Sequence, residues 1–166
     1  MTGNDTQQRR FWNELVTLRK HVYYLNEYYD KSDKIDRYIS CLLALSSSGS
    51  IAGWAIWNEF GLIWAFIIAT SQVVNAIKHY FPYKTRMKHI TKLMNALDRL
   101  YIYAEHKWHA VSQGMLSNDE INVLTTKFKK RKCKYIHEML DECSLPTNNK
   151  IMAIAESMAH DYFSHF

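Results

Sequence analysis

Two pairs of polar residues in this sequence have the spacing of metal ligands on a helix. His106 and His109 are three residues apart, with Glu105 beside them. Glu156 and His160 are four residues apart. Residues at these spacings share a helix face, so each pair can direct two ligand atoms at one cation. Most such pairs lie on solvated surfaces, and two ligands do not close a site, so we predict no metal site.

No catalytic motif accompanies these pairs. The sequence lacks a P-loop, the glycine pattern of a dinucleotide-binding turn, an HExxH pattern and a nucleophile elbow. Nothing places a nucleophile beside an acid–base pair. We therefore expect that the protein is not an enzyme and has no catalytic residues.

The sharpest charge feature is a basic run at residues 127–134, in a chain whose net charge is +5. Clustered Lys and Arg attract phosphate-bearing ligands, anionic lipid or nucleic acid. In a helix the charges of this run spread around the axis, which favours a solvated face over a patch for a soluble ligand. For anionic lipid we favour the basic residues at 78–92, and we predict no nucleic-acid partner. The candidates for anionic lipid or a ligand are Lys78, Lys84, Arg86, Lys88, Lys92, Lys129, Lys130, Arg131 and Lys132.

Two apolar runs dominate the middle of the sequence. Residues 38–58 carry no formal charge, Glu59 follows, and residues 60–77 again carry none. A helix that crosses the hydrocarbon core of a bilayer needs roughly 17–25 residues, so each run is long enough for one span. Only residues 58–61 separate the two apolar cores, which predicts a tight antiparallel hairpin of two transmembrane helices.

Small residues recur at four-residue spacing within both runs. Gly49 and Gly53 form a GxxxG pattern in the first run, among several serines. In lipid, small residues let two helix backbones approach closely, so we expect them to pack helices and subunits together. The helix-packing candidates are Ala44, Ser48, Gly49, Ala52, Gly53, Ala65 and Ala69.

Four polar residues concentrate in the second half of the second run. Polar groups at membrane depth face protein or water, because lipid cannot satisfy their hydrogen bonds. These residues therefore either join helices or line a water-filled path, and both interpretations stay open. The pore-lining candidates are Thr70, Ser71, Gln72 and Asn75.

Lysine and arginine flank the two runs and are absent from the turn between them. Lys31, Lys34 and Arg37 precede the first run, and a second basic group begins at Lys78. Positive residues stay on the cytoplasmic side of a membrane. This asymmetry predicts that both termini are cytoplasmic.

The rest of the sequence predicts amphipathic helices near residues 6–36, 84–113, 118–143 and 149–164. The first two carry heptad seams, which let helices pack side by side. Ser117 and Glu120 have the spacing of a capping box at the start of the third helix. The apolar residues of the four helices are Phe11, Leu15, Leu18, Val22, Leu25 and Tyr29; Ile90, Met94, Leu97, Tyr101, Ala104, Trp108 and Val111; Ile121, Leu124, Phe128, Tyr135, Met139 and Leu140; and Ile151, Ile154, Met158 and Tyr162.

The sequence therefore predicts an all-α chain, in which a two-span transmembrane hairpin is continued by long amphipathic cytosolic helices. Residues 1–37 form an N-terminal amphipathic helix, residues 38–81 the hairpin and residues 82–166 a C-terminal cytosolic helical region. We expect these parts to form a single folding unit.

This order of parts resembles the SLATT family, the two-transmembrane effector domains associated with SMODS nucleotidyltransferases and SLOG sensor domains. The likeness rests on the uncharged run between Arg37 and Glu59, the turn at 58–61, the run at 62–77 and the helix through Trp108. The resemblance implies a pore-forming effector of prokaryotic antiviral defence, which kills or arrests an infected cell. It also implies control by a nucleotide signal, either a cyclic nucleotide ligand or a separate sensor protein.

We therefore expect a homo-oligomer that permeabilises the inner membrane, embedded in the lipid bilayer by two spans with both termini cytoplasmic. A cyclic nucleotide is the one small ligand expected, and no cofactor. Two alternatives stay open. A non-channel membrane anchor or adaptor would recruit a partner through its cytosolic helices. A soluble helical bundle would instead bury residues 39–77 in its own core.

Overall fold

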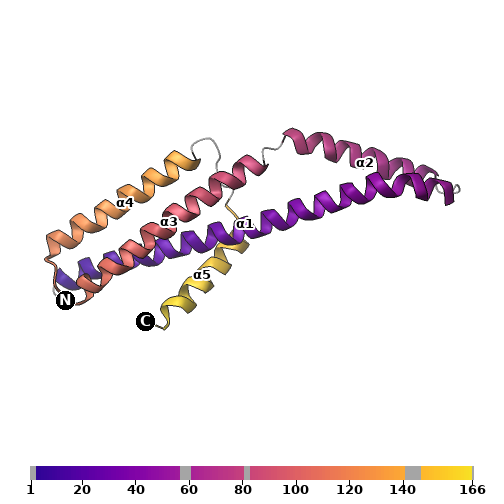
Figure 1. The fold of residues 1–166 in the computed structure, drawn as a ribbon. Helices are drawn as coiled ribbons and strands as arrows, with labels where there is room; N and C mark the ends of the chain where they lie inside the picture. The colour runs from indigo at the N-terminus through magenta and orange to yellow at the C-terminus, as the bar shows by residue number, and fades with distance from the viewer. Residues whose placement is uncertain (1–2, 57–60, 81–82, 141–146, 166) are drawn as a thin grey trace. The chain divides into compact units, whose positions relative to one another are not determined.

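The computed structural model describes residues 3–56, 61–80, 83–140 and 147–165, and every regular element in these ranges is an α-helix (Figure 1). The helices are α1 (Gly3–Ile56), α2 (Gly61–Tyr80), α3 (Tyr83–Ser112), α4 (Asn118–Leu140) and α5 (Asn149–Phe163). The prediction of an all-α chain is confirmed for this part of the sequence.

The chain divides into two compact units. Unit 1 consists of Met1–Tyr29 and Arg86–Phe166, and unit 2 consists of Asp30–Thr85. Unit 1 therefore combines the first half of α1 with α4, α5 and nearly all of α3. Unit 2 combines the second half of α1 with α2, and it includes the whole segment predicted to form a hairpin.

The first apolar run is not a helix of its own, because it continues α1, which begins at Gly3 and ends at Ile56. Among the residues that the structure describes, no helix is both long and apolar enough to cross a membrane. The prediction of a two-span inner-membrane protein with both termini cytoplasmic is therefore wrong. Polar residues at 46–50 and 70–75 interrupt the two runs, and each polar group reduces the free energy gained on transfer to hydrocarbon.

The core of unit 1 is built on the apolar seam of α1. Phe11, Leu15, Leu18, Val22 and Leu25 are all buried, as the heptad spacing predicts. Most of the α3 seam is buried as well, namely Ile90, Leu97, Tyr101, Ala104 and Val111, while Met94 and Trp108 are partly buried.

Contacts between the two seams confirm that α1 and α3 pair side by side. The rings of Phe11 and Trp108 are stacked with their centroids 6.0 Å apart. Arg19 of α1 pairs with Asp98 of α3 at 3.2 Å. The pairing therefore combines buried apolar contact with an ion pair at its edge.

Helix α5 packs only in part through the residues predicted. Ile151, Ala155 and Ala159 are buried, whereas Ile154 is 46% exposed. The prediction that Ile154 belongs to the packed side is therefore wrong. Two alanines four residues apart leave room for a neighbouring helix to approach closely, and the distance between packed helices depends on such side chains.

Gly114 ends α3, as the sequence suggests. Its φ of +68° is a left-handed conformation that glycine adopts without steric cost. The N–H of Met115 donates to the carbonyl of Ala110 at 3.0 Å, and the N–H of Gly114 donates to that of Val111 at 3.1 Å. These two bonds form a Schellman motif, which satisfies carbonyls that the helix end would leave unpaired.

Side chains cap the starts of the last two helices. The N–H of Ser117 donates to the Glu120 carboxylate at 2.8 Å, and the N–H of Glu120 donates to the Ser117 hydroxyl at 3.4 Å. This arrangement confirms the predicted capping box. At α5, the side-chain oxygen of Asn148 accepts from the N–H groups of Lys150 and Ile151.

We predict that Leu97→Ala destabilises unit 1 by about 2–5 kcal/mol, because it leaves a cavity in the core. Leu97 is 1% exposed. Ile102→Ala on the same helix is the matched control, since Ile102 is 58% exposed and exposed sites change stability by about 0.5 kcal/mol or less. Urea unfolding followed by circular dichroism measures both. Equal losses in the two variants would contradict the assigned core.

Candidate functional site

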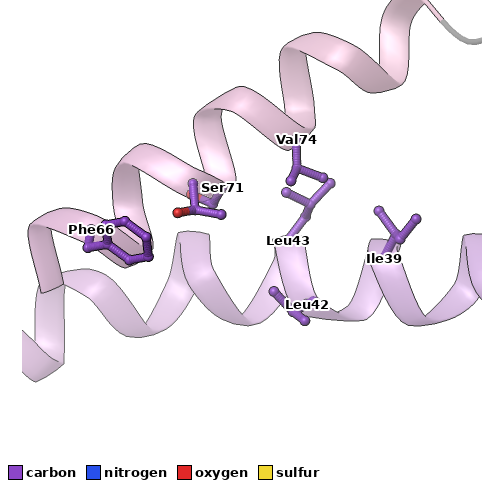
Figure 2. Close-up of a pocket in the computed structure, with 7 residues that line it drawn as sticks. Ile39, Leu42, Leu43, Phe66, Ser71 and Val74 are labelled. Carbon is purple, nitrogen blue, oxygen red and sulfur yellow. The ribbon is translucent and has the colours of Figure 1, made fainter. Parts of the chain in front are cut away.

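An apolar groove of about 290 Å³ lies between α1 and α2 within unit 2. Figure 2 shows Leu43 of α1 and Val74 of α2 pointing toward one another across it. No charged group lines it, and the Ser71 hydroxyl donates to the carbonyl of Ile68 at 2.8 Å. The groove therefore offers shape and apolar contact, without the charges that bind ions or drive catalysis. Its lining consists of Ile39, Leu42, Leu43, Phe66, Thr70, Ser71 and Val74.

An exposed apolar stripe on α1 leads into this groove. Ile35, Tyr38, Ile39 and Leu42 are all exposed, with Tyr38 75% exposed and Leu42 64% exposed. Their spacing of i, i+3, i+4 and i+7 places them on one helix face. Because Ile39 and Leu42 also line the groove, the stripe and the groove form one apolar surface.

Helix α2 carries a second exposed apolar face. Leu62 is 88% exposed, Phe66 74% and Val73 57%. At 100° per residue, these three side chains lie within about 40° of one another around the helix. We call them the α2 ridge. Phe66 belongs to both the ridge and the groove, so the ridge extends the same apolar surface.

The small residues predicted to pack helices are only partly described. Ala44, Ala65 and Ala69 are exposed. The side chains of Ser48, Gly49, Ala52 and Gly53 lie outside the described residues. On α2, Ala65, Ala69 and the exposed Ala76 form a row beside the ridge, because their spacing of four and seven residues returns to the same side of the helix. We call them the alanine row.

The four pore-lining candidates do not share one helix face. Thr70 and Ser71 line the groove, whereas Gln72 and Asn75 are exposed and are not among its lining residues. Thr70 and Gln72 are separated by about 200° around α2, since each residue turns the helix by 100°. The structure therefore places two of these residues in the groove lining and the other two outside it.

The basic candidates near residues 78–92 differ in exposure. Lys88 and Lys92 are exposed on α3, and Arg86 is partly buried, with its guanidinium 6.0 Å from the centre of the Tyr28 ring. The side chains of Lys78 and Lys84 lie outside the described residues. Among the described side chains of this segment, Arg86 is therefore packed against the fold, and Lys88 and Lys92 are solvated.

Glu14 of α1 separates the basic run of α4 into two groups. Lys132 donates to one carboxylate oxygen of Glu14, and Lys129 lies 3.4 Å from the other. Burial alone would raise the pKa of Glu14, but the hydrogen bond and charge of Lys132, aided by Lys129, lower it below its ordinary value of 4.5. Lys130 and Arg131 are exposed instead. Two of these four candidates therefore serve the fold.

His21 lies beside this cluster. Its Nδ1 atom is buried and has no hydrogen-bond partner in the described part of the chain. Burial lowers the pKa of His21 below its ordinary value of 6.5, and the positive charges of Lys132 and Lys20 lower it further. A neutral imidazole is thus favoured in the folded state.

A tyrosine-lined arginine is a feature that local sequence patterns did not indicate. The guanidinium of Arg19 lies 4.6 Å from the ring centre of Tyr23, 4.7 Å from that of Tyr101 and 4.8 Å from that of Tyr162. Each ring face attracts the cation. These rings come from α1, α3 and α5, so only their tertiary arrangement reveals the site. The tyrosines in three amphipathic helices were the available signal.

Glu105 completes this cluster, although the sequence places it beside His106 and His109. Its Oε1 accepts hydrogen bonds from the hydroxyls of Tyr101 at 2.8 Å and Tyr162 at 2.9 Å. Burial raises the pKa of the Tyr101 hydroxyl, and its hydrogen bonds with Tyr162 and Glu105 reinforce this. The arrangement ties α3 to α5 and keeps Tyr101 in its neutral form.

The remaining metal-ligand candidates lie on solvated surfaces. His106, His109 and His160 are exposed, and Glu156 pairs with Lys20 at 2.9 Å. Among the described residues, no three His, Cys, Asp or Glu side chains gather closely enough to hold a metal ion.

Comparisons with protein-family models, with curated proteins and with solved structures give no match for this chain.

We predict that the free energy of unfolding falls as the pH decreases from about 7.5 to about 5.5, because the unfolded state binds a proton that folded His21 resists. His21 has a lowered pKa, so its contribution is complete above 6.5 and is lost below it. Glu14, with a pKa below 4.5, stays ionised throughout this window.

Denaturant unfolding at several pH values measures this effect. The variant His21→Gln should show a smaller decrease than the wild type. His106→Gln is the control, because His106 is exposed on α3 and should leave the decrease unchanged. An unaltered pH dependence in His21→Gln would contradict the assignment.

Proposed function

We propose that this protein is a self-assembling helical interaction protein and not an enzyme. In this proposal the apolar surface of unit 2 joins copies of the chain. The observation that carries it is the exposure of the α2 ridge, where Leu62 and Phe66 are 88% and 74% exposed. Burying a side chain of this size stabilises a complex by roughly 1.5–3 kcal/mol, so such a surface favours association.

The chemistry of this surface favours a second copy over a partner of opposite charge. Apart from Ile35, the described part of the surface comes from residues 38–44 and 61–76, which include no Asp, Glu, Lys or Arg. Recognition must therefore depend on shape. The α2 ridge of large side chains lies beside the alanine row, so a two-fold pair can place each ridge along the alanine row of the other copy.

The wider role implied by the resemblance, in prokaryotic antiviral defence under a nucleotide signal, stays a prediction. Self-assembly is the part of that role that the geometry supports. Membrane permeabilisation depended on two spans and is not part of this proposal. The exposed basic residues of unit 1 stay available for a regulating partner in such an assembly.

We predict that Leu62→Ser/Phe66→Ser converts an oligomer into a monomer, because the variant removes the two most exposed side chains of the α2 ridge. Sedimentation velocity of the full chain in buffer measures the change. Ile102→Ser/Ile154→Ser is the matched control, since it replaces two exposed apolar residues of unit 1 and should stay oligomeric. A wild-type chain that is monomeric at all accessible concentrations would refute the proposal.

We predict further that Ala69→Leu weakens self-association, although it makes the surface more apolar. A leucine fills the alanine row and blocks the close approach of the second copy, whereas adsorption to lipid would be strengthened by about 0.8 kcal/mol per added CH₂ buried. Sedimentation and vesicle flotation of the same variant therefore distinguish the two. Tighter flotation with unchanged oligomerisation would assign the surface to lipid and overturn the proposal.

A further inference from the structure

Four exposed cations of α4 form a stripe on its outer face. Lys127, Lys130, Arg131 and Lys134 follow i, i+3, i+4 and i+7 spacing, so they lie on one helix face. They line an open hollow of about 450 Å³ in unit 1. Because Lys129 and Lys132 turn to Glu14 instead, the run is sorted into an inner pair and an outer stripe.

The stripe is poorly compensated by acids. No Asp or Glu occurs in residues 121–137. Lys134 lies 3.6 Å from Glu138, but Lys127 and Lys130 have no acidic partner within ion-pair distance in the described part of the chain. Like charges three and four residues apart destabilise a helix, so this face costs stability that an anion would restore.

Two polar residues of α4 and an arginine of α1 adjoin the cationic face. Arg10 of α1 donates to the side-chain oxygen of Asn122 at 3.0 Å, and Asn122 lines the same hollow as Thr126. Amide and hydroxyl groups beside clustered cations suit the oxygens of a phosphorylated ligand. Arg131 is also oriented by packing, since its guanidinium lies 6.0 Å from the ring centre of Tyr103.

We propose that this face of α4 binds a ligand that carries two or more clustered phosphates. The requirement for more than one phosphate follows from length, since Lys127 and Lys134 are separated by roughly 10 Å along the helix axis. A single phosphate cannot contact cations at both ends. The ligand is either a free polyphosphate compound or a lipid headgroup with several phosphates, because both present the same charge pattern.

Calorimetric titration of the full chain with inorganic tripolyphosphate tests the proposal. We expect binding that weakens as salt increases, since exposed charge contacts are screened. The double variant Lys127→Gln/Lys130→Gln should weaken it by about tenfold or more, because both lysines lose charge-assisted contacts. Arg131 is left intact because it packs on Tyr103.

The matched control is Lys88→Gln/Lys92→Gln. These lysines are exposed on α3 of the same unit, are four residues apart and remove the same charge. Affinity should stay within about twofold of wild type, because charges outside the contact act only through screened long-range attraction. An equal loss in both double variants, or no binding of tripolyphosphate by the wild type at low salt, would overturn the proposal.

Two further arms identify the source of the phosphates. Vesicles of phosphatidylcholine with a phosphoinositide bisphosphate should bind and be competed by tripolyphosphate if a headgroup is the ligand. Vesicles should fail to bind if the ligand is free, and either result supports the site. Much tighter binding of a single-stranded oligonucleotide than of tripolyphosphate would assign the face to nucleic acid and refute the proposal.

The thermal stability of the variant without ligand shows whether the variant still folds. If the fold does not use Lys127 and Lys130, the variant Lys127→Gln/Lys130→Gln should unfold at a temperature equal to or slightly above that of wild type in low salt. Tripolyphosphate should then raise the unfolding temperature of wild type but not of this variant. A lower unfolding temperature of the free variant would show that the lysines hold the fold, contrary to the proposal.

Discussion

The apolar seam of α1 is the interaction on which unit 1 depends, because each of its other helices packs against it. Phe11 contacts Trp108 of α3 and Phe128 of α4, and Trp12 contacts Phe163 of α5. Gly114 then ends α3, and side-chain caps begin α4 and α5. A heptad seam can hold partners on more than one side because large aromatic side chains reach beyond a single neighbouring helix.

Unit 2 has the opposite balance, since its apolar residues exceed what two helices can bury between themselves. Leu43 and Val74 point toward one another across the groove, while Leu62 and Phe66 stay 88% and 74% exposed. Two helices have too little mutual contact to cover both of their apolar faces. Unit 1 buries its apolar seam within itself, whereas unit 2 leaves large apolar side chains exposed. For this reason the proposed assembly is assigned to unit 2.

Charge is divided between fold and surface within a single helix. On α4, Lys129 and Lys132 share Glu14, and the cations on the outer face lack comparable compensation. A partly buried carboxylate is costly without cations, which explains why two lysines must turn inward. The charge of the partly buried Arg19 is compensated as well, by three aromatic ring faces and by Asp98. The basic composition of the chain therefore has both a structural and an exposed component.

Local sequence patterns were sufficient for the seam of α1, the end of α3 and the start of α4, but they did not show that α1 continues to Ile56. The seam from Phe11 to Leu25, the capping box at Ser117 and the stop at Gly114 all depend on residues within one or two turns of each other. The membrane assignment was wrong because uncharged length was weighed more heavily than the polar residues within each run. Periodicity also favoured the bulky Ile154, where tertiary packing selected alanines.

By itself, then, the sequence determined an all-helical chain, the seam that joins α1 to α3 and the caps, since short-range spacing encodes these features. Only the tertiary structure decided which lysines of α4 pair with Glu14, which rings surround Arg19 and which apolar side chains of unit 2 stay exposed. Lys132 lies 118 residues from Glu14 along the chain, and Asp98 lies 79 residues from Arg19. Contacts at such separations depend on how whole helices pack, and no local pattern specifies that.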